Sequence, residues 1–130
     1  MLDTTVGTTL KRAMTGEWLA SAVQPPVSQL SLAAAGSIQG DAAAILTTSE
    51  VVTVTTDGAG KGVRLPVPTG TNDCRVITNL DGTNAVKIWP TVGNYINGLA
   101  VNTALSMAVK TSALCVAVSA TQWAIIVSAV

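Results

Sequence analysis

Residues 62–123 constrain the fold most, because they form a series of short β-type runs, each followed by a residue that turns the chain. The clearest runs, with the residues that end them, are 62–65 with Pro66, 74–79 with Asp81-Gly82, and 85–89 with Pro90. Proline cannot donate to a strand ladder, and Asp-Gly favours a tight turn, so we read each run as a separate strand. The Asp81-Gly82 turn predicts a β-hairpin formed by the second and third runs.

Further runs of the same kind fill the rest of the chain after about residue 38. They are 42–46, 51–55, 104–109, 111–119 and 123–127. About eight short strands at this spacing predict an all-β fold, namely an antiparallel β-sandwich or jelly roll. The chain has 130 residues, so we expect one such domain over residues 38–130.

Residues 1–37 lack strand alternation and include Pro25-Pro26, a pair that cannot lie inside a helix or a central strand. Before this pair, Leu10, Met14 and Trp18 fall close to helical spacing. We therefore predict an extended or partly helical N-terminal arm whose three large apolar side chains dock on a partner protein, with packing back on the domain as the alternative.

The last predicted hairpin is apolar on both faces. One face of its first strand carries Leu114, Val116 and Val118, and its second strand places Trp123 and Ile125 opposite Ile126. Strands that are apolar on both sides are buried on both sides. These six residues are therefore predicted to form the core or an oligomer interface, and we expect a homo-oligomer.

Composition argues against catalysis and against several kinds of partner. The chain has no His, and its 7 basic and 7 acidic residues are scattered, which leaves no catalytic triad, no ordinary zinc site and no concentrated basic face for nucleic acid. We place five of the acidic residues in predicted turns, namely Asp41, Glu50, Asp57, Asp73 and Asp81. No apolar stretch is long enough for a membrane helix. We expect no enzyme activity, no cofactor, no metal, no nucleic-acid partner and no membrane partner.

The two cysteines, Cys74 and Cys115, lie inside β-type runs. We interpret them as small buried hydrophobic residues, with a disulfide between adjacent strands as the alternative. Among the aromatic residues, the register of Trp123 favours the core, whereas Trp89 and Tyr95 could form a platform for a sugar.

The ordered set of segments resembles a β-module of tailed-bacteriophage virion proteins, found in capsid decoration (cement) proteins, head fibres and parts of tail fibres. The segments that carry the resemblance are Val63-Arg64-Leu65-Pro66, Gly70, Cys74 to Asn79, Val86 to Pro90, Ile96-Asn97-Gly98 and Gln122-Trp123. The resemblance covers roughly residues 62–130 and leaves the N-terminal arm outside.

The resemblance implies a non-enzymatic structural protein, usually trimeric, that binds the outer shell of the head and stabilises it. Its partner would be the major capsid protein or another virion protein, and its location the capsid surface after assembly in the host cytoplasm. Two alternatives remain open: a tail-fibre or baseplate adaptor, and a receptor- or glycan-binding tip that would use Trp89 and Tyr95.

Overall fold

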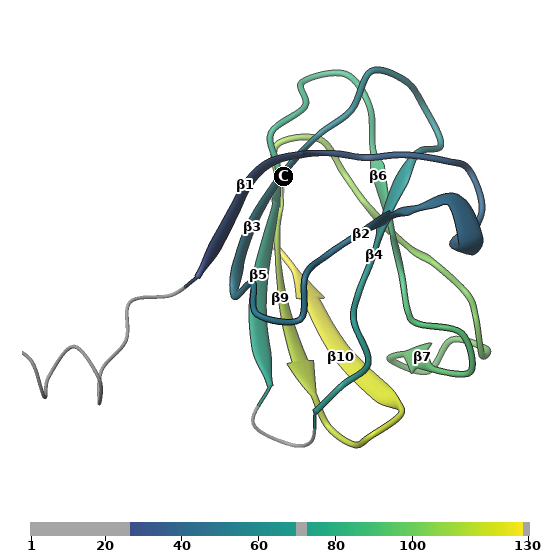
Figure 1. The fold of residues 1–130 in the computed structure, drawn as a ribbon. Coiled ribbons are helices and arrows are strands. Elements are labelled where there is room, and N and C mark those ends of the chain that lie inside the picture. Colours follow the sequence, from purple (N-terminus) through teal and green to yellow (C-terminus); the bar gives the residue numbers. More distant parts are fainter. Residues whose placement is uncertain (1–26, 70–72, 129–130) are drawn as a thin grey trace, which may run out of the picture.

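The computed structural model describes residues 27–69 and 73–128. Two β-sheets face each other and are wound from one chain into a β-solenoid of about four turns (Figure 1). The six-stranded sheet has the order β1 (Ser28–Ala33), β3 (Val51–Thr55), β5 (Cys74–Asn79), β9 (Ser112–Ala117), β10 (Gln122–Val127) and β7 (Tyr95–Ile96). The four-stranded sheet has the order β2 (Ala43–Ala44), β4 (Gly62–Arg64), β6 (Val86–Trp89) and β8 (Leu105–Met107). A short 3₁₀ helix, η1 (Gln39–Asp41), lies between β1 and β2.

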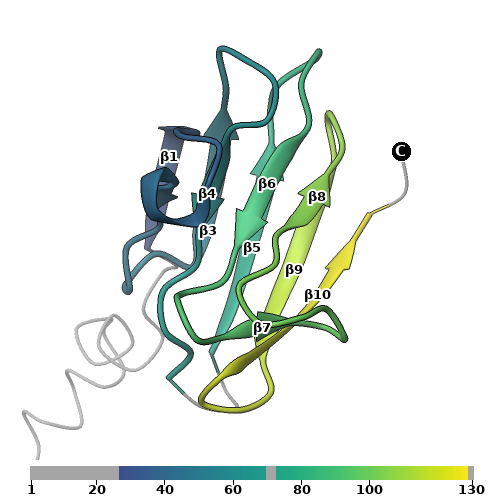
Figure 2. The same cartoon turned by 90° about the vertical axis from the view of Figure 1, so that its right-hand side faces the viewer.

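The predicted antiparallel sandwich or jelly roll is wrong, because most neighbouring strands run parallel. In the first three turns the chain alternates between the sheets, so each strand stacks on the strand one turn earlier. Ser28 lies opposite Val51, and Val51 lies opposite Val76, so one turn takes 23 to 25 residues. β2, β4 and β6 stack in the same way in the second sheet. Figure 2 shows β4, β6 and β8 of this sheet side by side.

The hairpin predicted around Asp81-Gly82 is also wrong, since β5 and β6 belong to different sheets. The turn residues instead form a corner. The Asp81 carboxylate accepts hydrogen bonds from the backbone N–H groups of Thr83 and Asn84. This side chain bends the chain from one sheet into the other, and the strands then pair with neighbours from other turns.

The hairpin predicted at the end of the chain is confirmed. β9 and β10 pair antiparallel, with Trp123 opposite Ala117 and Ile125 opposite Cys115. β9 also pairs antiparallel with β5, and β8 pairs antiparallel with β6. The parallel strands of each sheet are therefore followed by a strand that runs in the opposite direction, β9 in one sheet and β8 in the other.

The core lies between the two sheets and follows from strand alternation. Val52, Val54 and Ile77 point inward from the six-stranded sheet, and Val63 and Ile88 point inward from the four-stranded sheet. Trp123 is the largest fully buried side chain, and its indole N–H donates to the carbonyl of Pro66 at 3.3 Å. This core is continuous through all the turns.

Both ends of the six-stranded sheet are irregular. Beside β10, the amide of Asn97 takes the place of a neighbouring strand: Ile125 N–H donates to Asn97 Oδ1 at 2.8 Å, and Asn97 Nδ2 donates to the Ile125 carbonyl at 3.1 Å. At the other end, β1 carries a bulge at Ser31, whose φ is +57°. A blocked edge and a bulged edge both discourage pairing with a foreign strand.

The folded part of the chain begins before residue 38. β1 and the buried Ala34 lie within residues 1–37, the segment predicted as an arm. Of that segment, only residues 1–26 lie outside the described residues.

We predict that Asn79→Ala lowers the free energy of unfolding by about 2–4 kcal/mol, because it removes a fully buried amide with three partners. Asn79 Nδ2 donates to the carbonyls of Asn84 and Ala108, and Asn79 Oδ1 accepts from the N–H of Asp81. Chemical denaturation measures the change. Asn84→Ala is the matched control at the same corner, and equal losses from both variants would contradict the assignment.

Candidate interaction surface

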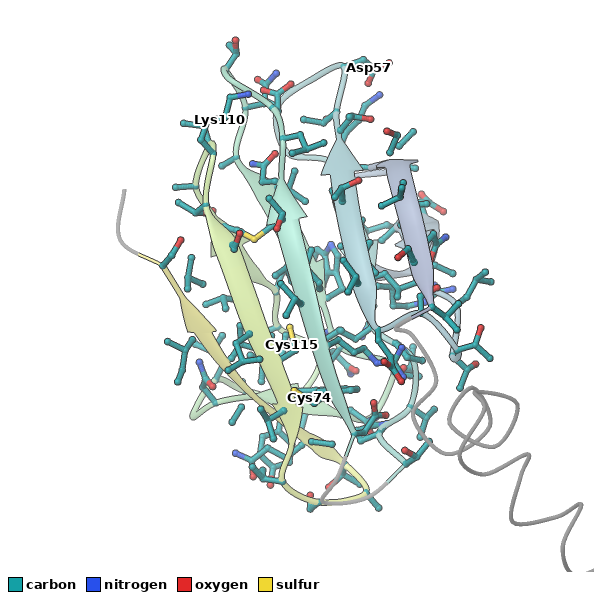
Figure 3. All side chains as sticks on the ribbon, turned by 90° about the vertical axis from the view of Figure 1, so that its left-hand side faces the viewer. Asp57, Cys74, Lys110 and Cys115 are labelled. Carbon is teal, nitrogen blue, oxygen red and sulfur yellow. The ribbon has the colours of Figure 1, made fainter. Side chains whose placement is uncertain are left out.

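The outer face of the six-stranded sheet carries an apolar row that crosses four strands. Val51, Val76, Leu114 and Ile126 lie opposite one another in register on β3, β5, β9 and β10. Val76, Leu114 and Ile126 are 37%, 41% and 72% exposed. Figure 3 looks onto this face. Burial of a large aliphatic side chain stabilises by roughly 1.5–3 kcal/mol, so this row is a favourable contact surface.

A second row lies beside the first and has smaller side chains. Cys74, Val116 and Ala124 are in register on β5, β9 and β10. Thr53, Thr78 and Ser112 border the apolar row on its other side. The outward positions of β3, β5, β9 and β10 carry no charged side chain. We call these two rows and their hydroxyl border the outer face.

The six residues predicted as core or interface divide between the two roles. Trp123 and Ile125 lie in the core. Leu114, Val116 and Ile126 lie on the outer face, and Val118, 44% exposed, follows β9 in the same alternation. Sequence reasoning missed Val51 and Val76, because it examined the last hairpin alone. The strong alternation of residues 51–55 and 74–79 was the signal that could have found them.

The interpretation of both cysteines as buried is wrong for Cys74, which is exposed on the outer face, and right for Cys115, which is buried in the core. Arg75 lies opposite Cys115, so Cys74 and Cys115 occupy neighbouring strands but point to opposite sides of the sheet (Figure 3). Both thiols are free. Burial raises the pKa of the Cys115 thiol to about 12.

Arg75 is the one buried cation among the described residues, and backbone carbonyls surround it. Its guanidinium donates to the carbonyls of Leu46, Thr47 and Ser49 at 3.1, 2.8 and 2.5 Å. It also pairs with Asp73 at 3.1 Å. An open cavity of about 540 Å³ lies beside this cluster and is lined by Val27, Thr47, Thr48, Glu50, Thr69, Asp73, Cys74 and Arg75. Because Asp73 and Arg75 pair with each other, the rest of the polar lining of the cavity consists of three threonines and Glu50.

The other acidic residues with resolved roles serve the local fold. Asp57 pairs with Lys61, and the hydrogen bond and charge of Lys61 hold the pKa of Asp57 below its usual value. Hydrogen bonds from the backbone of Asn84 and Thr83 lower the pKa of Asp81. Within residues 27–69 and 73–128, no three His, Cys, Asp or Glu side chains gather into a set that could hold a metal ion.

The two candidate glycan-binding residues belong to different sheets. Trp89 is partly buried on β6, and the Lys87 ammonium lies 5.8 Å from its ring centre. Tyr95 is partly buried on β7 of the six-stranded sheet. Their placement therefore does not form one continuous surface on a single sheet.

The predicted docking residues of the arm, Leu10, Met14 and Trp18, lie outside the described residues. Among the residues that are described, no helix has the length and apolar character needed to cross a membrane. No protein-family model matches the chain, and a comparison with curated proteins finds no relative.

We predict that one thiol per chain, that of Cys74, reacts with a thiol reagent in the folded protein at pH 8, and that Cys115 reacts only after denaturation. The raised pKa of Cys115 stabilises the fold below the pKa of the unfolded thiol, and this stability is lost as pH rises from about 9 towards about 12. Titration of reactive thiols and denaturation at several pH values check both points. Two equally fast thiols in the folded chain would contradict the placement, and Cys115→Ala should flatten the loss at high pH.

Proposed function

We propose that this chain is a non-enzymatic structural protein of a virion, a decoration protein that binds the outer head shell as a homo-oligomer, for which we expect a trimer. The observation that carries the proposal is the outer face, an uncharged apolar surface presented by a rigid sheet. Such a surface serves binding to protein better than it serves chemistry on a small molecule. The resemblance of residues 62–130 to virion β-modules supports the same class.

A division of labour between the two parts of the chain follows from this proposal. The solenoid supplies the oligomer contact, and the segment 1–26 supplies Leu10, Met14 and Trp18 for the shell. Contacts repeated in each copy of an oligomer strengthen attachment through multivalency, without a covalent bond. In the sequence this segment directly precedes Val27 and β1, and β1 is the edge strand of the six-stranded sheet.

Several charged groups of the described residues support a structural role. Arg75 binds Asp73 and the carbonyls of the loop 46–49, Asp57 binds Lys61, and Asp81 accepts backbone hydrogen bonds at a corner. A general acid or base needs a free group in a site that can take a substrate. These groups are engaged in the local structure instead.

A tail-fibre or baseplate adaptor is the second candidate, because the same outer face and arm would serve attachment to a tail protein. The two candidates differ only in where the chain lies on the particle. The position of the chain therefore separates them.

We predict that particles released from cells that carry this gene contain the chain in many copies, and that an antibody to it labels the head in electron micrographs. Mass spectrometry of purified particles gives the copy number. Label on the tail would favour the adaptor, and purified particles that lack the chain would contradict a virion role.

The arm's role is tested in the full-length chain, because a deletion of residues 1–37 would also remove β1 and part of the core. A variant with Leu10, Met14 and Trp18 changed to Ser should lose attachment to particles while keeping its β-type circular dichroism. Val92→Ser, at a position that is 70% exposed outside the strands, is the control and should still attach.

A further inference from the structure

We propose that the outer face binds the same face of another copy of this chain. The inference deepens the proposed function, on which it rests for the expectation of an oligomer, by naming the surface and its partner. In this arrangement the apolar rows of the copies meet about a shared symmetry axis, and the hydroxyl border lies along one side of the contact.

The absence of charge on the outward positions of β3, β5, β9 and β10 favours a like partner. Where copies meet through the same face, residues near the symmetry axis lie beside their own equivalents, so a charged residue there would meet a like charge. This face brings none. A partner recognised by opposite charge would find nothing to pair with here.

The exposure of the apolar row indicates that burial by a binding partner would be favourable. Ile126, next to the last residue of β10, is 72% exposed, and Leu114 and Val76 in register with it on β9 and β5 are 41% and 37% exposed. A contiguous patch of this kind on a flat sheet is typical of an interaction site. Edge pairing is a less favourable route to association, because Asn97 covers part of the β10 edge and a bulge interrupts β1.

The size of the face sets the strength of the expected contact. Four strands about 4.8 Å apart and about 17 Å long present roughly 300 Å² in projection. A standard stable interface covers about 800 Å² on each partner. The face alone therefore predicts a reversible association that depends on protein concentration.

Cys74 is a natural reporter of this contact, because it lies on the outer face beside Val116 and Ala124, whereas Cys115 is buried. The experiment measures the rate of maleimide labelling of Cys74 in the full chain. The protein concentration is varied about a hundredfold, so that a Kd anywhere within that range is detected. We expect labelling to slow about tenfold at the upper end, as the occupied fraction approaches nine-tenths.

Ile126→Asp should remove this protection, because the carboxylates of two copies would face each other across the contact. Leu114→Ser is a second variant with a gentler change on the neighbouring strand, and it should weaken the protection. Val92→Asp is the matched control, similarly exposed at 70% and placed outside the strands, and it should keep full protection. Circular dichroism confirms that each variant is folded.

Two results would overturn the proposal. Protection that is independent of concentration would mean that a segment of the same chain, such as residues 1–26, covers the face. Labelling that is fast at every concentration, in a chain whose solution mass is that of one copy, would mean that the face stays open. Neither result touches the virion role, which depends on the presence of the chain in particles.

Discussion

The buried guanidinium of Arg75 is the interaction on which the arrangement of the turns depends. It binds three carbonyls of the loop 46–49, which leads from the first turn to the second, and it belongs to β5 of the third turn. It also lies 5.6 Å from the ring centre of Trp123 in the last hairpin. A buried charge without partners costs several kcal/mol, so loss of the contacts of Arg75 would strongly destabilise this packing. One side chain thus joins early, middle and late segments of the solenoid.

The inward position of Arg75 also decides what the outer face contains. Because side chains alternate along a strand, Arg75, Ile77 and Asn79 point inward and Cys74 and Val76 point outward. The ends of the sheet are closed by different means, an Asn97 amide beside β10 and a bulge in β1. The solenoid therefore presents a broad apolar face rather than an open edge, and we expect copies of the chain to associate through that face.

The sequence predicts the positions of the strands far better than their partners. Residues 51–55 and the last hairpin are found where alternation placed them. Strands of a sandwich and of a solenoid show the same two-residue alternation of inward and outward side chains. This alternation therefore does not reveal whether a strand pairs with its neighbour in sequence or with the strand one turn away. The corner at Asp81 looked like a hairpin turn for that reason. Cys74 was misplaced because an inward arginine is the exception among strand residues.

Sedimentation equilibrium of the unmodified full chain tests association through the outer face. We predict a mass that rises with concentration from that of one 13.1 kDa chain to two or three times that value. We also predict that Ile126→Asp holds the mass at one chain. A mass of one chain at every concentration, with the outer face open to solvent, would contradict this association.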